Sequence, residues 1–278
     1  MILAMLYCLD NKIKFVLYSK DANFGYDKGW TDYFLPFCEE ETGHFHHKQN
    51  PSNADWKKKI KPQILIYHLF HKNTYLTFEL FPCFRGKTFV RKQFDIPELG
   101  IKGGLREALP VLVDLTWKYN QNTQNIIDQL TASLHLPEHY IGFHIRSGDK
   151  YTEAELLNVS DYVEKAEEKS ILKNAFVLTD NYEVINHFHS SFNDWDISTL
   201  CNPNEKGYFH KNFIKQSKEH KKKQFETFFA SMEILNRANI FIGTFSSNLG
   251  LFLGVRRPKD TSFGVDSDDC LMWIWQWT

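Results

Sequence analysis

The amino-acid sequence predicts an α/β protein whose second half contains a doubly wound parallel sheet. After residue 137, short apolar runs rich in β-branched and aromatic residues alternate with longer runs of helical periodicity. Strands and helices that alternate along a chain form parallel sheets, because each helix returns the chain to the starting end of the next strand. The predicted strands are residues 140–145, 175–178, 196–199 and 240–242, and the predicted helices are 159–171, 182–190, 218–237 and one that starts within 247–254.

The first half of the chain is less regular, but its periodicity still predicts short elements. Apolar residues 1–9 predict a helix, and the alternation over residues 13–18 predicts a strand. Residues 30–37 have helical spacing, and two further apolar runs predict strands at 64–68 and 75–81.

A long helical pattern runs from Pro110 to Ser133. Proline suits the first turn of a helix, where its missing backbone donor is not needed. We expect this helix to connect two domains. The predicted organisation is an N-terminal α/β domain over residues 1–110, a connecting helix over 111–136 and a C-terminal domain over 137–278.

The composition narrows the class of protein. The chain has 278 residues, of which 42% are hydrophobic and 24% charged, as is typical of a soluble protein with a substantial core. The formal net charge of -1 gives no basic surplus for nucleic-acid binding. The aromatic content of 15% has two interpretations: aromatic-rich packing, or a carbohydrate-handling protein in which aromatic faces stack on sugar rings.

The cysteines and the N-terminus bear on the compartment. No CxxC pair occurs, which argues against a structural zinc site, and the wide spacing of an odd number of cysteines argues against a disulfide framework. The apolar run from Met1 to Leu9 is too short to span a bilayer and lacks a basic region before it. We therefore predict a soluble, cytoplasmic protein that is not transmembrane. The five cysteines are Cys8, Cys38, Cys83, Cys201 and Cys270.

Polar clusters follow three predicted strands of the second half. In a parallel sheet these strand ends share one edge, so we expect the clusters to converge on one ligand. The first cluster suits a di- or triphosphate, because Arg146 forks onto phosphate oxygens and Lys150 adds a point charge. The clusters are His144, Arg146, Ser147, Asp149 and Lys150; then Thr179, Asp180 and Asn181; then Thr244, Phe245, Ser246, Ser247 and Asn248.

Each cluster also has a structural interpretation. An Asp or Ser after a strand often caps the next helix, and His144 either contacts a ribose or phosphate or is a hydrogen-bonded structural histidine. In the ligand interpretation, Asp180 accepts a hydrogen bond from a ribose or a base. Ser246 and Ser247 then bind a phosphate together with the N–H groups of the helix that they open.

These motifs resemble the fucosyltransferase superfamily, which includes the α1,6-fucosyltransferases of N-glycan cores, the rhizobial nodulation fucosyltransferases and the protein O-fucosyltransferases. The family motif His-x-Arg-Arg-x-Asp-Lys stands here at residues 144–150, with serine in place of the second arginine. The similarity is densest over residues 140–270. The other similar segments are Thr152 to Ala154 followed by Tyr162, Leu178 to Asn181, Thr244 to Ser247, Gly29 and Trp30 with Phe34 and Pro36, and Ser267 to Asp269.

The resemblance implies a GT-B-like fold of two facing Rossmann-like halves, with the acceptor on the N-terminal half and the nucleotide sugar on the C-terminal half. It implies an inverting transferase that moves fucose from GDP-fucose to a glycan hydroxyl without a metal ion or other cofactor. Fixed cations and backbone donors must then neutralise the departing diphosphate. The implied site is Arg146 with Lys150 as catalytic cations, Glu153 as the base, a donor site of His144, Arg146, Ser147, Asp180, Asn181, Thr244, Phe245, Ser246 and Ser247, and Tyr162 and Trp30 on the acceptor side.

Several positions depart from the family pattern. Ser147 replaces the second arginine, Asn181 replaces the second aspartate of Thr-Asp-Asp, and a helical aspartate of the family falls at Ser231, with Glu226 and Glu233 as neighbouring substitutes. The sequence also has no counterpart of the Gly-rich loop that is usual near the family's N-terminus. The alternatives are a GT-B transferase with another nucleotide sugar, and a catalytically impaired protein that binds GDP or a glycan.

Three further features have competing interpretations. Glu153 is also a carboxylate of the kind that the helix dipole favours at a helix start. Asp266 and Asp268 form an Asp-x-Asp metal signature, but they lie close to the C-terminus, where that signature does not belong. The histidines of residues 44–47 have no matching ligand set nearby, and we expect them in a polar loop.

Overall fold

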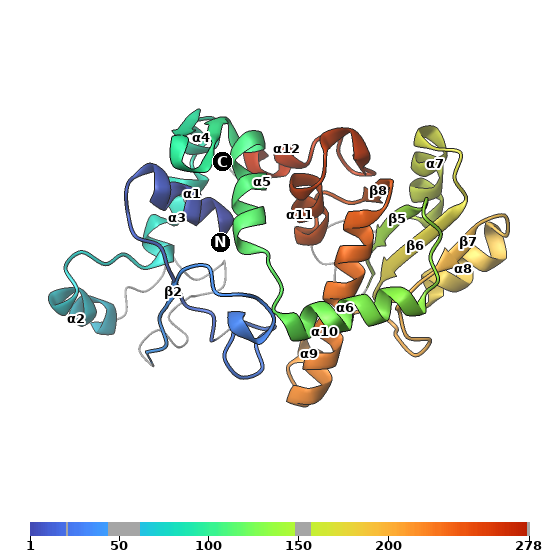
Figure 1. Ribbon diagram of the computed structural model, residues 1–278, viewed down its shortest axis with the longest axis horizontal. Coiled ribbons are helices and arrows are strands. Elements are labelled where there is room, and N and C mark those ends of the chain that lie inside the picture. The colour runs from blue at the N-terminus through green and yellow to red at the C-terminus, as the bar shows by residue number, and fades with distance from the viewer. Residues whose placement is uncertain (21, 44–61, 148–156, 277–278) are drawn as a thin grey trace. The chain divides into compact units, whose positions relative to one another are not determined.

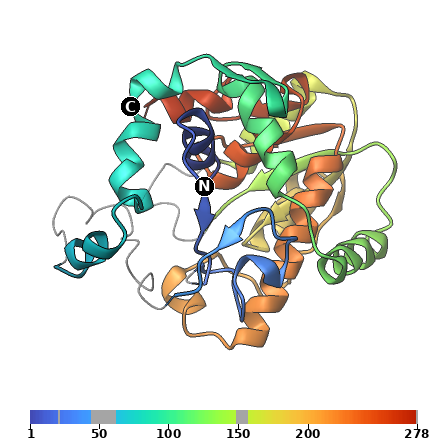
Figure 2. The ribbon, with the colours of Figure 1, turned by 60° about the vertical axis from the view of Figure 1, so that its left-hand side comes forward.

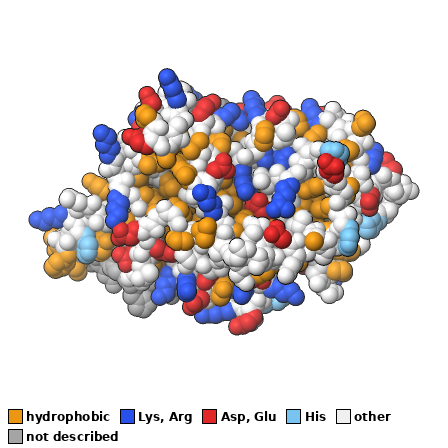
Figure 3. Space-filling view, in the orientation of Figure 1, with side chains coloured by type: hydrophobic (Ala, Val, Ile, Leu, Met, Phe, Trp, Pro, Cys, Tyr) orange, Lys and Arg blue, Asp and Glu red, His pale blue; other side chains and the backbone are white. Residues whose placement is uncertain are grey.

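The computed structural model describes all residues except 21, 44–61, 148–156 and 277–278. The chain forms two compact units (Figure 1). Unit 1 contains residues 1–32 and 36–116, and unit 2 contains residues 33–35 and 117–276. In the described part of the chain, no helix combines the length and apolarity needed to cross a membrane. Basic and acidic side chains are interspersed on the face in Figure 3, in keeping with the net charge of -1.

Unit 2 is built on a five-stranded parallel sheet, which confirms the predicted α/β class. Its central strand β5 (Ile141–Ile145) is buried over its whole length and lies between β6 (Asn174–Thr179) and β8 (Ile240–Gly243). The edge strands are β7 (Asp196–Ser198) and β9 (Ser262–Gly264), so the spatial order is β7-β6-β5-β8-β9. The chain completes one side of β5 before it crosses to the other, which is the order of a doubly wound sheet.

Helices pack on both faces of this sheet (Figure 2). Phe143 of β5 belongs to a buried cluster with residues of α7 (Val159–Lys169) and α8 (Glu183–Ser191). On the opposite face, α10 (Lys218–Arg237) crosses so closely that a Cβ at Gly142 would lie 2.8 Å from Leu235 Cδ2. Glycine at position 142 therefore permits this helix to pack on the strand. The other helices of unit 2 are α6 (Gln121–Ser133), α9 (His210–Phe213), α11 (Asn248–Arg256) and α12 (Cys270–Gln276), with a 3-10 turn η5 (Lys259–Thr261).

The predicted long helix over residues 110–133 is two helices in the structure. α5 (Leu105–Thr116) lies in unit 1 and α6 in unit 2. A new helix begins after Asn120 because its side chain accepts a hydrogen bond from the N–H of Thr123 (2.9 Å). The intervening backbone bonds to residues 33–35 instead of continuing the helix. Pro110 lies inside α5, since that helix begins at Leu105.

Unit 1 is mainly helical, and its described strands are short. β1 (Val16–Leu17) pairs in parallel with β2 (Glu39–Glu40), and β3 (Phe94–Ile96) pairs antiparallel with β4 (Ile101–Gly103). The helical elements are α1 (Ile2–Asp10), η1 (Trp30–Asp32), α2 (Pro62–Phe70), α3 (Thr77–Arg85), α4 (Lys87–Val90), η3 (Pro97–Leu99) and α5.

The strand predictions at residues 64–68 and 75–81 are wrong, because these segments lie mostly in α2 and α3. Short apolar runs have no decisive period, so a buried strand and a buried turn of helix look alike in sequence. The missed signal for α3 is Glu79, whose carboxylate accepts a hydrogen bond from the N–H of Leu76 (2.6 Å) at the helix start.

Asp32 holds together the loop of unit 1 that precedes it. Its carboxylate accepts hydrogen bonds from the N–H groups of residues 26–29, at nitrogen–oxygen distances of 2.8 to 3.0 Å. Burial by itself raises the pKa of this carboxyl. The four N–H donors outweigh burial and hold the pKa of Asp32 below its usual value.

We expect Asp32→Asn to lower the free energy of unfolding at neutral pH by about 1.5–3 kcal/mol, as for hydrogen bonds to a charged acceptor. Because the native pKa is lowered, the stabilisation is present above the unfolded-state pKa of about 3.9 and is lost as the pH falls through the native value. Urea denaturation should therefore show the gap between parent and variant closing below about pH 4. Asp27→Asn, at an exposed neighbour, is the control, and an equal loss in both variants would contradict the prediction.

Candidate functional site

Two turns that carry sequence motifs lie at the carboxyl edge of the unit 2 sheet. One follows β5 and contains Arg146 and Ser147, both half-buried, and the other follows β8 and contains residues 244–247. β5 and β8 are neighbours, and the direction of strand addition reverses between them. Open α/β sheets bind ligands at such a switch point. The structure thus brings two predicted clusters to one edge of the sheet, and the third follows β6, the other neighbour of β5.

Asp180, directly after β6, is engaged with the protein backbone. Its Oδ1 accepts a hydrogen bond from the N–H of Ser147 (2.7 Å), and its Oδ2 accepts one from the N–H of Tyr208 (2.8 Å). Its carbonyl oxygen also accepts from the N–H of Gly207 (2.7 Å). Asp180 therefore positions the turn after β5 and a later loop, whereas the sequence predicted a contact with a ribose or base.

Asn181 and Ser147, two positions that depart from the family motif, are in contact with each other. The Asn181 amide Nδ2 donates to Ser147 Oγ (3.3 Å), and its Oδ1 accepts from the N–H of Glu183 (3.2 Å) at the start of α8. The pair is neutral. The turn after β5 therefore carries Arg146 as its cation among the described residues.

The turn after β8 is held by Asp266, which follows β9. Its Oδ1 accepts from the N–H of Phe245 (2.7 Å) and its Oδ2 from the N–H of Ser246 (2.9 Å). Ser247 caps α11, since its Oγ accepts from the N–H of Gly250 (2.9 Å) and donates to the carbonyl of Thr244 (2.8 Å). The capping interpretation of Ser247 is thus correct, and the backbone N–H groups of residues 245 and 246, near the start of α11, already bind a carboxylate.

The Phe245 side chain is a core residue. It is 2% exposed, and a Cβ at Gly254 or at Gly264 would lie 2.8 or 2.5 Å from its ring. Its predicted contact with the donor through the side chain is therefore not supported by this packing. Two glycines leave room for the ring beneath the turn.

The turns on the two sides of the switch point are held by the same kind of contact, an aspartate that accepts hydrogen bonds from backbone N–H groups. Asp180 after β6 holds the turn after β5, and Asp266 after β9 holds the turn after β8. In each case an aspartate after the outer strand accepts from the backbone of the turn after the inner strand, from one N–H group for Asp180 and from two for Asp266. The sequence signal is an aspartate within two residues of a strand end, whereas sequence pattern alone suggests a ligand contact for Asp180 and an Asp-x-Asp metal signature for Asp266. Among the described residues, no group of three or more His, Cys, Asp or Glu is placed to hold a metal ion.

Tyr162 contacts the turn after β8 through its hydroxyl group. The side chain is 2% exposed on α7, and its hydroxyl hydrogen-bonds to the side chain of Thr244. Burial, and then the charge of Asp266, raise the pKa of Tyr162 well above its usual value. The structure therefore corrects the predicted contact of Tyr162 with the acceptor: the ring lies in the core next to the sheet.

Trp30 is likewise buried, within unit 1. Its ring is 3% exposed and packs edge-on against Phe24 and Phe37, and its backbone N–H donates to Ser19 Oγ (2.6 Å). The predicted contact of Trp30 with the acceptor is therefore also corrected: Trp30 is a core residue of unit 1. Gly29, with φ of +90°, makes the turn that inserts the ring, and a Cβ there would collide with Ser19.

His144 is buried, with 6% of its surface exposed, on β5. Side chains alternate along a strand, so His144 shares the face of Gly142, against which α10 packs. Burial on this strand is compatible with both interpretations of His144, a ligand contact and a structural histidine. Lys150 and Glu153, and the neighbouring Asp149, lie outside the described residues, and their predicted roles stay predictions.

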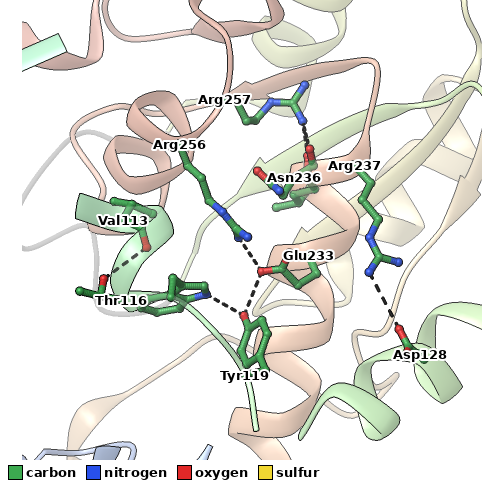
Figure 4. A network of polar contacts seen from close by, with 11 residues as sticks. Val113, Thr116, Tyr119, Asp128, Glu233, Asn236, Arg237, Arg256 and Arg257 are labelled. Atoms are coloured by element: carbon green, nitrogen blue, oxygen red, sulfur yellow. Dashed lines mark hydrogen bonds and ion pairs between the residues drawn. The ribbon is translucent and has the colours of Figure 1, made fainter. Parts of the chain in front are cut away.

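Glu233 of α10 belongs to a polar network within unit 2 (Figure 4). Trp117 Nε1 donates to the Tyr119 hydroxyl (2.8 Å), which donates to Glu233 Oε1 (3.0 Å). Arg256 pairs with the same oxygen at 2.5 Å. Burial and the Glu233 charge raise the pKa of Tyr119 well above its usual value. Glu233, a predicted substitute for the helical aspartate of the family, is thus committed to this network.

Ser231 and Glu226, the other residues of this comparison, also have partners in the protein. The Ser231 hydroxyl is buried and donates to the carbonyl of Thr227 (2.9 Å) along its own helix. Glu226 lies 3.8 Å from the Lys222 ammonium. All three groups near position 231 therefore have a partner within the protein.

Comparisons with known proteins identify the fold. No protein-family model and no curated protein sequence matches the chain. Crystal structures of the α1,6-fucosyltransferase NodZ do match: one soaked with GDP-fucose at 14% identity and a TM-score of 0.54, and one co-crystallised with GDP at 14% and 0.53. The fucosyltransferase NodZ from Bradyrhizobium matches at 13% and 0.54. Each alignment covers 92% of this chain and 87% of the other. The chain therefore has the GT-B fold of the fucosyltransferases that its motifs resemble.

Proposed function

We propose that the protein transfers fucose from GDP-fucose to a hydroxyl group of a glycan, with inversion and without a metal ion. The observation that supports this proposal best is the turn after β5, where Arg146 follows the buried central strand at the switch point of the sheet. This turn carries the His-x-Arg motif, and the shared fold is that of an enzyme whose structure was soaked with GDP-fucose.

In the proposed reaction, the acceptor oxygen attacks the anomeric carbon from the face opposite the diphosphate. The new carbon–oxygen bond forms as the bond to the diphosphate breaks, and GDP leaves with the electron pair. Arg146 binds the phosphate oxygens as their negative charge grows, which lowers the barrier more than it stabilises the ground state. A carboxylate takes the acceptor proton, for which we propose Glu153, and Lys150 adds positive charge at the diphosphate.

Calorimetric titration with GDP, with and without EDTA, tests the donor site. We expect micromolar binding that EDTA does not change, followed by turnover of GDP-fucose in the presence of a suitable glycan. Parallel assays with GDP-mannose and a UDP-sugar separate a fucosyltransferase from a GT-B transferase with another donor. Binding of a UDP-sugar in place of GDP would refute the proposed donor.

A second function has support from specific contacts. Asp180 and Asp266 bind backbone N–H groups, and Glu233 pairs with Arg256, so these three carboxylates of unit 2 already have partners. Because these carboxylates are bound within the protein, the contacts are also compatible with a catalytically impaired protein that binds GDP or a glycan. This alternative predicts GDP binding without turnover of GDP-fucose on any acceptor of a broad glycan panel.

A further inference from the structure

A loop between β7 and α9, which we call the return loop (residues 199–209), comes back to the carboxyl ends of the central strands. At its start, Thr199 Oγ1 donates to the carbonyl of Val177 in β6 (2.7 Å). At its end, the N–H groups of residues 207 and 208 donate to the carbonyl and carboxylate of Asp180. Because Asp180 also binds the N–H of Ser147, the return loop and the turn after β5 are held by one residue.

Within the return loop, Lys206 lies opposite Asn181 in an antiparallel bridge. Two backbone hydrogen bonds flank the pair: Tyr182 N to Glu205 O (2.9 Å) and Gly207 N to Asp180 O (2.7 Å). Residues 181 and 206 therefore form the type of pair that is not itself hydrogen-bonded. In such pairs the two side chains leave the backbone on the same side and start closest together.

The direction of the Asn181 side chain then gives the direction of Lys206. Asn181 Nδ2 donates to Ser147 Oγ, so this side chain points to the turn that holds Arg146. The Lys206 side chain starts on the same side, and its four-carbon stem is flexible and exposed. Among the described residues, no carboxylate forms an ion pair with Lys206 in the structure.

We propose that Lys206 is a diphosphate-binding residue that acts beside Arg146. Ser147 and Asn181 are neutral, and the departing GDP carries more negative charge than Arg146 and the proposed Lys150 together neutralise. Lys206 of the return loop would add a point charge there, whereas the guanidinium of Arg146 binds two phosphate oxygens at once. This inference rests on the proposed function, because it assigns Lys206 to the nucleotide-sugar site.

Calorimetric titration with GDP of the parent protein and of Lys206→Gln, Lys206→Arg and Lys211→Gln tests the inference. We expect Lys206→Gln to weaken GDP binding about tenfold, as for loss of one charge-assisted contact, and to reduce its dependence on salt. Lys206→Arg should retain most of the affinity because it keeps the charge. Lys211→Gln removes an exposed lysine from nearby α9 and should stay within twofold of the parent.

The outcomes separate this inference from the proposed function. If the parent binds GDP and Lys206→Gln binds it within twofold, the assignment of Lys206 is overturned while the proposed function stands. If Lys211→Gln loses as much affinity as Lys206→Gln, the effect is one of general charge and the specific site is overturned. If the parent does not bind GDP, both the proposed function and the role of Lys206 are overturned. Thermal unfolding of each variant checks folding, which an exposed substitution should leave unchanged.

Discussion

Replacing Arg257 by methionine is expected to lower the free energy of unfolding by about 3–5 kcal/mol. The Arg257 side chain is buried, and its guanidinium donates to the carbonyl oxygens of Leu235 (2.9 Å) and Ala238 (2.8 Å) at the end of α10. Further bonds reach the Asn236 carbonyl and Ser262 Oγ. The last carbonyls of a helix have no partner within the helix. Methionine fills a similar volume but leaves these buried acceptors without donors.

The charge state of Arg257 supports this expectation. Burial lowers its pKa to about 10, so the guanidinium is still protonated at neutral pH and all its N–H groups remain donors. Urea denaturation followed by circular dichroism measures the loss. The matched control is Arg237→Met, because Arg237 is exposed and lies 3.9 Å from the Asp128 carboxylate (Figure 4). That exposed pair should contribute less than about 1 kcal/mol. A similar loss in both variants would refute the proposed helix-capping role of Arg257.

Arg146→Ala is expected to weaken GDP binding by about 10- to 100-fold and to reduce fucose transfer by about 100- to 1000-fold. The larger effect on transfer follows because negative charge on the diphosphate grows toward the transition state. Arg146→Lys should recover only part of the affinity, since it keeps the charge but loses the two-pronged contact.

Calorimetry with GDP and initial rates with GDP-fucose measure the two effects separately. Arg237→Ala, which removes an exposed arginine charge from unit 2, is the control and should change neither. An Arg146→Ala protein that binds GDP within twofold of the parent would rule out Arg146 as the phosphate clamp. Arg146 is half-buried, so thermal unfolding should accompany the titration to confirm that the variant is folded.

The sequence was most informative where period and burial agree. β5 was predicted at residues 140–145 and lies at 141–145, and the helix predicted at 218–237 has these bounds in the structure. The order of strands and helices predicted the parallel sheet, and position at strand ends predicted that the clusters after β5 and β8 share one edge. These features depend on local pattern and on rules of chain connection, both of which can be seen in one sequence.

The hydrogen-bond partners of the site residues could not be predicted from the sequence, because they depend on which strands become neighbours in the sheet. Nothing local in the sequence shows that Asp266 binds the N–H of Phe245, since twenty-one positions separate them. Tyr162 was placed by motif spacing, which says nothing of burial, and its ring lies in the core. The sequence likewise gives no signal for Lys206, because the bridge that orients it pairs residues 25 positions apart.

The hydrogen bond from Ser147 to Asp180 has a consequence for how this site can evolve. Asp180 binds the backbone N–H of position 147, and every amino acid except proline has that group. This bond therefore does not depend on the side chain at position 147, so a cation can be lost or regained there while Asp180 still holds the backbone of the turn. A single substitution can thus change the charge of the turn after β5, while Asp180 continues to join that turn to the return loop.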